Sequence, residues 1–304
     1  MTAPDDAATP RATPLILSVA HSLGEIDLNP TRRAHTAAIV VDVIRATTTL
    51  AVMFEHGARR VLVARDVEQA RRARVSLPLA ILAGEVNAVA PPDFDHGNSP
   101  EEWSTARLAD REILFSTTNG ARALHAAMGG GPVFAGSLRN ASAVCSAALT
   151  AARQLATATE PGRVSVICSG LGEQPADDDS LCAGWLIYAL QRMAGQMGIA
   201  AEPGAGAPYA LDLLAARRRA YAGSDDGDAL DANPRAWLEA ALAETPAARG
   251  IQQVGLGEDL AWCVDVDAST AVPMVAGEDV ARQLVIVELA PPDVSDTPIG
   301  GETS

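Results

Sequence analysis

The stretch Ala38–Leu50, AIVVDVIRATTTL, decides the fold class of this chain. A continuous apolar run is followed by an aspartate, and a run of threonines then opens a helical pattern. Such an apolar run is typical of a strand buried on both faces, as in a parallel sheet covered by helices. The same layout of strand, polar turn and helix recurs at Ile113–Leu124 and Val164–Gly184. We therefore predict an α/β protein with a mixed, largely parallel sheet in three α/β/α layers, with room for two lobes.

Short apolar runs elsewhere outline the other elements. The predicted strands are Leu15–Val19, Ala38–Val43, Val61–Ala64, Ala80–Ala83, Ile113–Ser116, Val133–Ala135, Val164–Cys168 and Leu284–Glu288. Apolar residues at three- and four-residue spacing predict helices over residues 138–155 and 182–197. The Ala-rich segment from about 200 to 245 is predicted to be helical, with a polar loop, SDDGDALDANP, at residues 224–234.

The predicted domain organisation follows these elements. Residues 14–199 are assigned to an α/β catalytic core, and residues 200–290 to a helical layer with a final strand that completes the core. The segments 1–13 and 291–304 are mixtures of Ala, Pro, Thr, Asp and Gly without apolar periodicity. They are predicted to be disordered tails.

Charge and composition exclude several classes of function. The chain has 23 basic and 38 acidic residues, giving a net charge of −15, so neither nucleic acid nor a membrane surface is an expected partner. All the basic residues are arginine, which excludes a Schiff-base lysine and a phosphate-binding Walker-A lysine. No apolar run approaches the ~18 residues of a membrane span. With a polar N-terminal stretch and four separated cysteines, a cytoplasmic protein is expected.

The three strand–turn–helix units carry small polar residues where α/β proteins bind anions. Helix N-termini at the carboxyl ends of strands present free N–H groups to such ligands. Candidate substrate contacts in these turns are Thr47, Thr48, Thr117, Thr118, Asn119, Cys168, Ser169 and Gly170. Arg45 and Arg122 fall near the first helical turns, where guanidinium groups could neutralise phosphate, sulfonate or carboxylate oxygens.

Acidic residues also fall at predicted strand ends. They are Asp42, Glu85 and the run Asp177–Asp179. Mg²⁺ prefers oxygen ligands and usually keeps waters beside one or two carboxylates and a substrate phosphate. A Mg²⁺ ion at these loops would also let a strongly acidic protein attract a small anionic phosphorylated substrate. The alternative for the aspartate run is a helix N-terminus that complements the helix dipole.

Seven motifs in order resemble those of the 2-phosphosulfolactate phosphatase family. They are DVIRATTTL, AGEV, DFDHGNSP, STTNGARAL, GSLRNASAV, CSGLGEQPADDDSLCAG and the late GLGEDLAWCVDVD. Their order and spacing agree with the family over roughly residues 14–290. The resemblance implies an α/β enzyme that is Mg²⁺-dependent and hydrolyses 2-phosphosulfolactate to sulfolactate and phosphate, a step of coenzyme M biosynthesis. It also implies a homo-oligomer.

The resemblance assigns roles to residues within these motifs. The implied catalytic residues are Asp42, Arg45, Glu85, Asn119, Arg122 and Asp179, with Asp42, Glu85 and Asp179 as metal ligands. Asn98, Gly120, Ser137 and Asn140 join the substrate contacts. Whether Asp42 is a nucleophile, a base or a metal ligand is left open by the motif.

The chain departs from the family pattern at three places. VNAVAPPDF replaces a loop that is usually richer in Gly and Lys, Asp178 stands where glutamate is common, and Ala247–Gly250 replaces a Ser/His-Gly stretch. The last change supports a second hypothesis, a diverged phosphatase for another small phosphorylated acid or sugar. A non-catalytic anion-binding protein is the third hypothesis, although anion binding alone gains nothing from three carboxylates.

Overall fold

The ten strands of the chain form one mixed sheet in the computed structural model, which describes residues 14–222 and 227–292. The strands are β1 (Leu15–Ala20), β2 (Thr36–Val41), β3 (Arg60–Val63), β4 (Ile81–Gly84), β5 (Glu112–Ser116), β6 (Val133–Gly136), β7 (Arg163–Cys168), β8 (Ala201–Pro203), β9 (Pro273–Asp279) and β10 (Leu284–Leu289). Their order is β4-β5-β3-β10-β9-β6-β2-β7-β1-β8. The antiparallel hairpin β9–β10 joins two parallel groups, β3-β5-β4 and β6-β2-β7-β1-β8. The predicted mixed, largely parallel sheet is confirmed.

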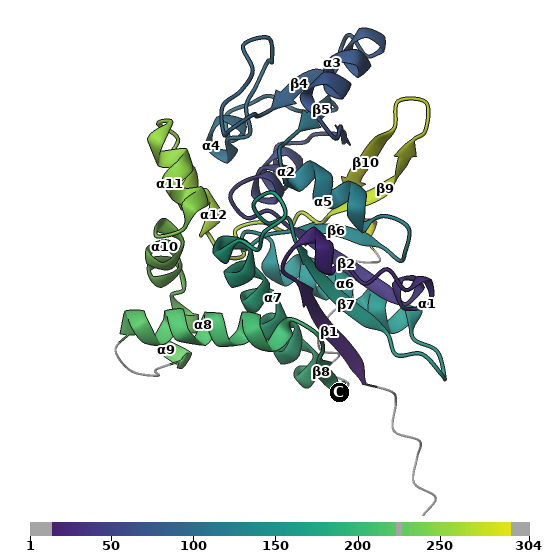
Figure 1. Ribbon diagram of the computed structural model, residues 1–304, viewed down its shortest axis with the longest axis vertical. Coiled ribbons are helices and arrows are strands. Elements are labelled where there is room, and N and C mark those ends of the chain that lie inside the picture. The colour runs from purple at the N-terminus through teal and green to yellow at the C-terminus, as the bar shows by residue number, and fades with distance from the viewer. Residues whose placement is uncertain (1–13, 223–226, 293–304) are drawn as a thin grey trace, which may run out of the picture.

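The helices connect these strands and extend the fold on one side. They are α1 (Pro30–Ala34), α2 (Ala46–Glu55), α3 (Val67–Ser76), α4 (Pro100–Trp103), α5 (Gly120–Ala127), α6 (Ala141–Leu155), α7 (Asp177–Gln196), α8 (Ala207–Ala222), α9 (Gly227–Ala232), α10 (Arg235–Ala243), α11 (Pro246–Gln253) and α12 (Asp259–Cys263), with a 3₁₀ turn η1 at Leu23–Glu25. The long α8 packs beside α7, and α10 and α11 continue from it toward α4 (Figure 1).

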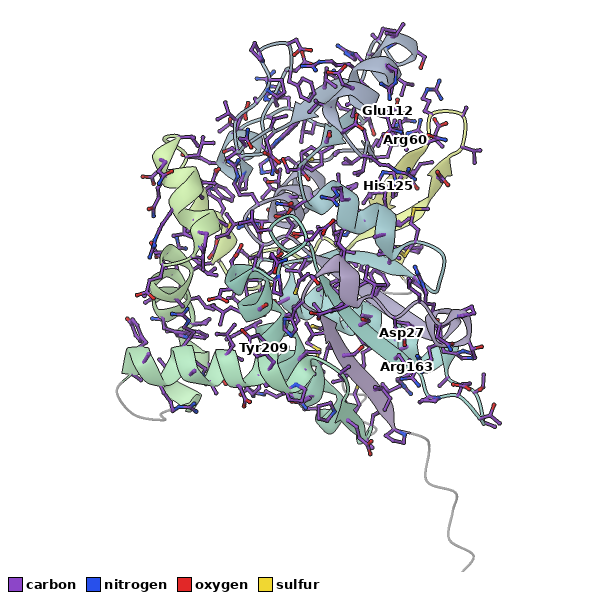
Figure 2. The ribbon with its side chains drawn as sticks, in the orientation of Figure 1. Asp27, Arg60, Glu112, His125, Arg163 and Tyr209 are labelled. Carbon is purple, nitrogen blue, oxygen red and sulfur yellow. The ribbon has the colours of Figure 1, made fainter. Side chains whose placement is uncertain are left out.

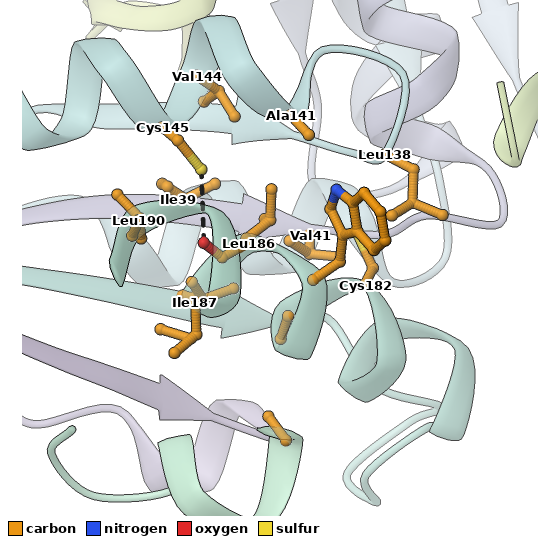
Figure 3. Packing of buried hydrophobic residues seen from close by; sticks show 14 of the residues in the cluster. Ile39, Val41, Leu138, Ala141, Val144, Cys145, Cys182, Leu186, Ile187 and Leu190 are labelled. Atoms are coloured by element: carbon orange, nitrogen blue, oxygen red, sulfur yellow. Dashed lines mark hydrogen bonds between the residues drawn. The ribbon is translucent and has the colours of Figure 1, made fainter. Parts of the chain in front are cut away.

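Residue alternation along the central strand β2 produces the layers. Ile39 and Val41 face the helices α6 and α7, whose Cys145 and Leu186 pack over them (Figure 3). The intervening residues of β2 belong to a second buried cluster with α2 and α5 on the opposite face. Because successive side chains of a strand point to opposite faces, a strand that is apolar at every position needs helices on both sides.

Two strands were not predicted, β8 and β9, and both lack a continuous apolar run. β8 has three residues, ends at Pro203 and pairs only with β1 at the sheet edge. β9 begins with Pro273 and includes Gly277, Glu278 and Asp279. Proline is tolerated at the first residue of a strand or at an edge, so neither position prevents pairing. Hairpin pairing with the apolar β10 holds β9 in the sheet.

The segment from about residue 200 to 245 is helical as predicted, with one difference inside the predicted polar loop. The short helix α9 forms there, and Asp231 anchors it by accepting hydrogen bonds from Tyr188 Oη at 2.6 Å and Arg192 Nη1 at 3.3 Å on α7. The predicted tails at 1–13 and, from residue 293 on, at the C-terminus lie outside the described residues. Among the helices that the structure describes, none is both long and apolar enough to cross a membrane.

Candidate active site

A cavity of about 280 Å³ lies at the carboxyl ends of β2 and β7, where the loops toward α2 and α7 leave the sheet. Its wall is completed by Asn119 before α5 and by the start of α11 from the helical layer. The lining residues are Asp42, Ile44, Asn119, Ser169, Gly170, Leu171, Pro175, Ala176, Asp177, Asp178, Asp179, Pro246 and Ala247. Four aspartates thus face one small volume, and no basic side chain is among the described residues that line it.

Asp42 lies in this wall and directly follows the last residue of β2. Its carboxylate accepts the Ala46 amide at 3.3 Å from the first turn of α2 and the Gly120 amide from the first turn of α5. Burial, and then the charge of Glu85, raise the pKa of Asp42 to about 6, against the opposing effect of these two amides. Two helix N-termini therefore orient one carboxylate that loses its proton only near neutrality.

Asp179 has both carboxylate oxygens engaged within the protein. Oδ1 accepts the Val43 amide at 3.0 Å, and Oδ2 accepts the Ser169 hydroxyl at 2.9 Å and the Gly170 amide at 3.0 Å. These bonds tie the loop after β7 to the loop after β2. Burial, Asp178 and Asp42 raise the pKa of Asp179 well above its ordinary value. Asp179 is thus positioned to fix the shape of the cavity.

Asp178, one residue earlier, differs from Asp179 because one of its carboxylate oxygens has no donor among the described residues. Its side chain is in the cavity wall and the residue is only 3 % exposed, yet its Oδ1 has no hydrogen-bond partner. Burial, followed by the charges of Asp42 and Asp177, raises the pKa of Asp178 to about 7. A buried carboxylate oxygen without a donor is costly, so this oxygen needs a water, an ion or a ligand from the cavity.

Glu85 is not among the residues that line the cavity, but its hydrogen bonds hold a turn that is part of the wall. Oε1 accepts the Thr118 amide at 2.7 Å and Oε2 accepts the Ala88 amide at 2.8 Å. The first bond fixes the turn that carries Asn119 and the Gly120 amide. Glu85 is close enough to Asp42 to raise its pKa, but both of its oxygens already have protein donors.

Arg45, a predicted anion clamp, is turned away from the cavity wall. Its Nη1 donates to Asp259 Oδ2 at 2.6 Å, and its Nη2 donates to the Ala88 carbonyl at 2.7 Å. The side chains of this ion pair are 2 % and 1 % exposed. Asp259 Oδ1 also accepts the Ser99 hydroxyl at 2.5 Å. The pair therefore joins α12 to α2 and α4, and most of the Arg45 charge is compensated by Asp259.

The structure brings five predicted site residues into the cavity wall, namely Asp42, Asn119, Ser169, Gly170 and Asp179. The other predicted residues support the turns or lie apart from it. Thr47 donates to the Asp42 carbonyl at 2.9 Å, and Thr48 to the Val43 carbonyl at 2.9 Å. Thr117 Oγ1 accepts the Ala121 amide at 3.0 Å at the start of α5.

The predicted residues that lie outside the wall divide into buried and exposed ones. Asn140 accepts the Ser137 amide at 2.9 Å and donates to the Ala271 carbonyl at 2.9 Å, so this pair stabilises the turn before α6. Cys168 is fully buried, and burial raises the pKa of its thiol. Asn98 is buried with Oδ1 unpaired, whereas Arg122 and Thr118 are exposed.

Asp178 lies within the predicted acidic run and at a position where the family commonly has glutamate, but the resemblance assigned it no role. Within residues 14–222 and 227–292, no three His, Cys, Asp or Glu side chains are arranged as a ready-made metal site. Asp42 and Asp178 lie in the same wall and repel each other, and Asp178 Oδ1 has no donor among the described residues. The arrangement can hold a cation that is completed by waters and a ligand.

Comparison with known proteins gives a consistent match over most of the chain. A family model described as 2-phosphosulpholactate phosphatase matches residues 25–278. A protein of Thermus thermophilus named probable 2-phosphosulfolactate phosphatase is 38% identical over 240 residues, covering 79% of this chain and 87% of its own. A protein of Deinococcus radiodurans with the same name is 33% identical over 257 residues, covering 84% of this chain and 94% of its own.

Proposed function

The chain belongs to the 2-phosphosulfolactate phosphatase family, and from that premise we propose that it hydrolyses 2-phosphosulfolactate to sulfolactate and phosphate with the help of Mg²⁺. Its enzyme class is that of a phosphoric monoester hydrolase. The coenzyme M pathway, a cytoplasmic location and a homo-oligomer stay predictions from the sequence.

The charge of the cavity carries this proposal. Four aspartates line about 280 Å³, while Arg45 is paired with Asp259 and Arg122 is not in the wall. A phosphate monoester is an anion and would be repelled by these carboxylates at short range. A divalent cation between the carboxylates and the phosphate monoester would turn this repulsion into attraction. The acidic cavity is therefore better explained by a metal-assisted reaction than by direct anion binding.

The residues present fit Mg²⁺. Asp178 Oδ1 is a buried oxygen without a donor, and Asp42 faces the same cavity with a raised pKa. Two carboxylates with waters and a substrate phosphate are a common Mg²⁺ ligand set. When bound, Mg²⁺ would offset the negative charge of the phosphoryl group and could lower the pKa of a bound water. Asp42 and Asp178 would hold it.

The chain's own residues supply positioning. The amides of Ala46 and Gly120 hold the Asp42 carboxylate in one orientation, and Asp179 keeps the Ser169–Gly170 turn against the β2 loop. Asn119 accepts the Gly172 amide through Oδ1 at 3.3 Å, which leaves its amide nitrogen to donate to a phosphoryl oxygen. Catalysis would then rest on orientation and charge compensation at the phosphorus.

A second candidate is a phosphatase for a phosphorylated acid with fewer charges. Pro246 and Ala247, at the start of α11, form an apolar part of the cavity wall at one of the places where the chain departs from the family pattern. A sulfonate would need a cationic or hydrogen-bonding partner there. Turnover of a phosphorylated carboxylic acid faster than 2-phosphosulfolactate would favour this candidate.

The test is phosphate release from 2-phosphosulfolactate with Mg²⁺ and with EDTA, for the wild type, Asp178→Asn and Asp177→Asn. Asp177 is the matched control because it lines the same cavity but is exposed and pairs with Arg217 at 3.5 Å, so Asp177→Asn removes one charge from the wall and leaves the buried oxygen of Asp178 in place. EDTA and Asp178→Asn should each lower turnover by about 10³-fold, because charge stabilisation of several kcal/mol is lost. Asp177→Asn should retain most of it. Full turnover in EDTA would overturn the metal dependence, and no turnover of any phosphate ester would favour an anion-binding protein.

A further inference from the structure

A second cavity, of about 400 Å³, lies on one face of the sheet rather than at its carboxyl edge. Its floor is a row of small side chains on adjacent strands, because Ser18 of β1 is in register with Ser165 of β7, which is in register with Ala38 of β2. On the opposite face the same strands are covered by α6 and α7. Here α5 covers only part of the floor, and small residues leave a hollow that larger ones would fill.

The rim of this cavity carries more positive than negative charge. Arg32, Arg33 and Arg163 line it, against Glu25 and Asp27. This is unusual in a chain with a net charge of −15. The excess distinguishes the face cavity from the acidic cavity at the carboxyl edge, where no basic residue is among the described residues of the wall.

Two of the three arginines already have partners. Arg32 forms a two-point ion pair with Asp27, whose Oδ1 also accepts the Asn29 amide. Arg33 donates to carbonyl oxygens at the end of α5, including Ala127 at 3.1 Å. Arg32 thus neutralises the Asp27 carboxylate, and Arg33 binds carbonyl oxygens at the C-terminus of α5, where a positive charge is favourable.

Arg163 is the exception. Among the described residues, its side chain forms neither a hydrogen bond nor an ion pair, and its Nε is buried without an acceptor. It lies next to Asp27 over the sheet face (Figure 2), close enough to lower the pKa of that carboxyl, but Arg32 occupies both Asp27 oxygens. A buried guanidinium N–H without an acceptor is costly, so the site is incomplete as it stands.

We propose that this cavity binds a small organic acid, with the carboxylate on Arg163. The hydroxyls of Ser18 and Ser165 lie on the floor beside it, and a guanidinium presents paired donors that match a carboxylate. Ile16 and Ile26 give the carbon part of the ligand apolar contacts. The volume falls in the range typical of small-molecule sites, about 300–1,000 Å³. This site does not depend on the function proposed for the acidic cavity.

The test is calorimetric titration of the full chain with malate as the probe, in buffer with EDTA so that the acidic cavity repels anions. We expect binding to the wild type and to Asp178→Asn. Arg163→Ala should weaken it by about tenfold or more through loss of a charge-assisted contact. Ser165→Val, which fills the floor without changing charge, should weaken it too. Arg153→Ala is the control, since Arg153 is exposed in the last turn of α6 and outside the cavity lining.

Three results would overturn the proposal. They are the absence of malate binding to the wild type, unchanged binding in both Arg163→Ala and Ser165→Val, and binding that is lost only in Asp178→Asn. Sedimentation of the same proteins covers another occupant of this face. If Arg163→Ala or Ser165→Val dissociates an oligomer and the wild type binds no malate, the face is an interface between copies of this chain.

Discussion

The two cavities of this sheet differ in charge, and the difference separates two ways of binding an anion. At the carboxyl edge, four aspartates and no basic residue are found among the described residues of the wall, so an anion needs a cation between itself and the protein. On the sheet face, Arg163 has an Nε–H without an acceptor among the described residues, so the proposed organic acid would bind there directly. The net charge of a chain therefore does not decide what each site attracts, because the local set of side chains does.

The same comparison applies within the acidic run at the start of α7. Asp179 has three donors on its two oxygens, whereas Asp178 Oδ1 has none among the described residues. A carboxylate whose acceptors are occupied holds the structure, and one with a free buried oxygen is available to a ligand. Both residues belong to the first turn of α7, the helix that follows β7 along the chain (Figure 1).

The largest expected effect on stability comes from breaking the buried ion pair between Arg45 and Asp259, which keeps the Arg45 charge away from the acidic cavity. Asp259→Ala would leave the buried Arg45 guanidinium without its counter-charge and free to approach the acidic cavity. Removing one partner of a buried ion pair costs about 3–5 kcal/mol of the free energy of unfolding. Urea denaturation of Asp259→Ala and the wild type measures this difference in the free energy of unfolding.

Glu258→Ala is the control for that substitution, because Glu258 is exposed and makes no side-chain cap at α12. It should change the free energy of unfolding by no more than about 0.5 kcal/mol. A loss below about 1 kcal/mol for Asp259→Ala would place the pair among weakly contributing ion pairs and contradict the role assigned to it.

A smaller effect is expected from Gly120→Ala, which acts on Asp42 and on the neighbouring first turn of α2 but not on Asp178. A methyl group there would lie 2.6 Å from Ala46 Cβ and 2.7 Å from Asp42 Oδ2. Such overpacking costs about 1–3 kcal/mol of the free energy of unfolding. Because the displaced carboxylate is the proposed metal ligand, kcat should fall as well.

Gly195→Ala tests the specificity of this effect in thermal unfolding and in the phosphatase assay. Gly195 is exposed on α7, and a methyl group at this position would extend into open space. Alanine there should raise the free energy of unfolding by up to about 1 kcal/mol through helix propensity. Equal kcat for Gly120→Ala and the wild type would show that the close approach of Gly120 to Asp42 has no part in the reaction.

Most of the fold could be predicted because apolar runs mark buried strands. The runs at Ile113–Ser116 and Val164–Cys168 coincide with β5 and β7 almost to the residue. β9 could not be found in this way, because Pro273 and Gly277 interrupt its pattern and its place depends on β10. The local sequence is enough to predict β5 and β7, whereas β9 forms because it pairs with β10.

The location of the candidate site could be predicted from the sequence, but the roles of its residues could be predicted only in part. Asp42 follows directly from a strand end, since ligands bind at the carboxyl ends of strands in α/β sheets. In contrast, Asp178 and Asp179 are identical residues in consecutive positions, and only the fold decides which has donors. Likewise, no local pattern links Arg45 to Asp259, which lies far along the chain.

Titration of the metal-free chain with Mg²⁺ by calorimetry tests the central claim most directly, with wild type, Asp178→Asn and Asp177→Asn compared at neutral pH. We expect a binding isotherm for the wild type and for Asp177→Asn, because both retain Asp42 and Asp178, the two proposed ligands among the four aspartates of the wall. Asp178→Asn should lose the isotherm. If Asp178→Asn binds Mg²⁺ as the wild type does, the buried oxygen of Asp178 is not a metal ligand and the account is contradicted.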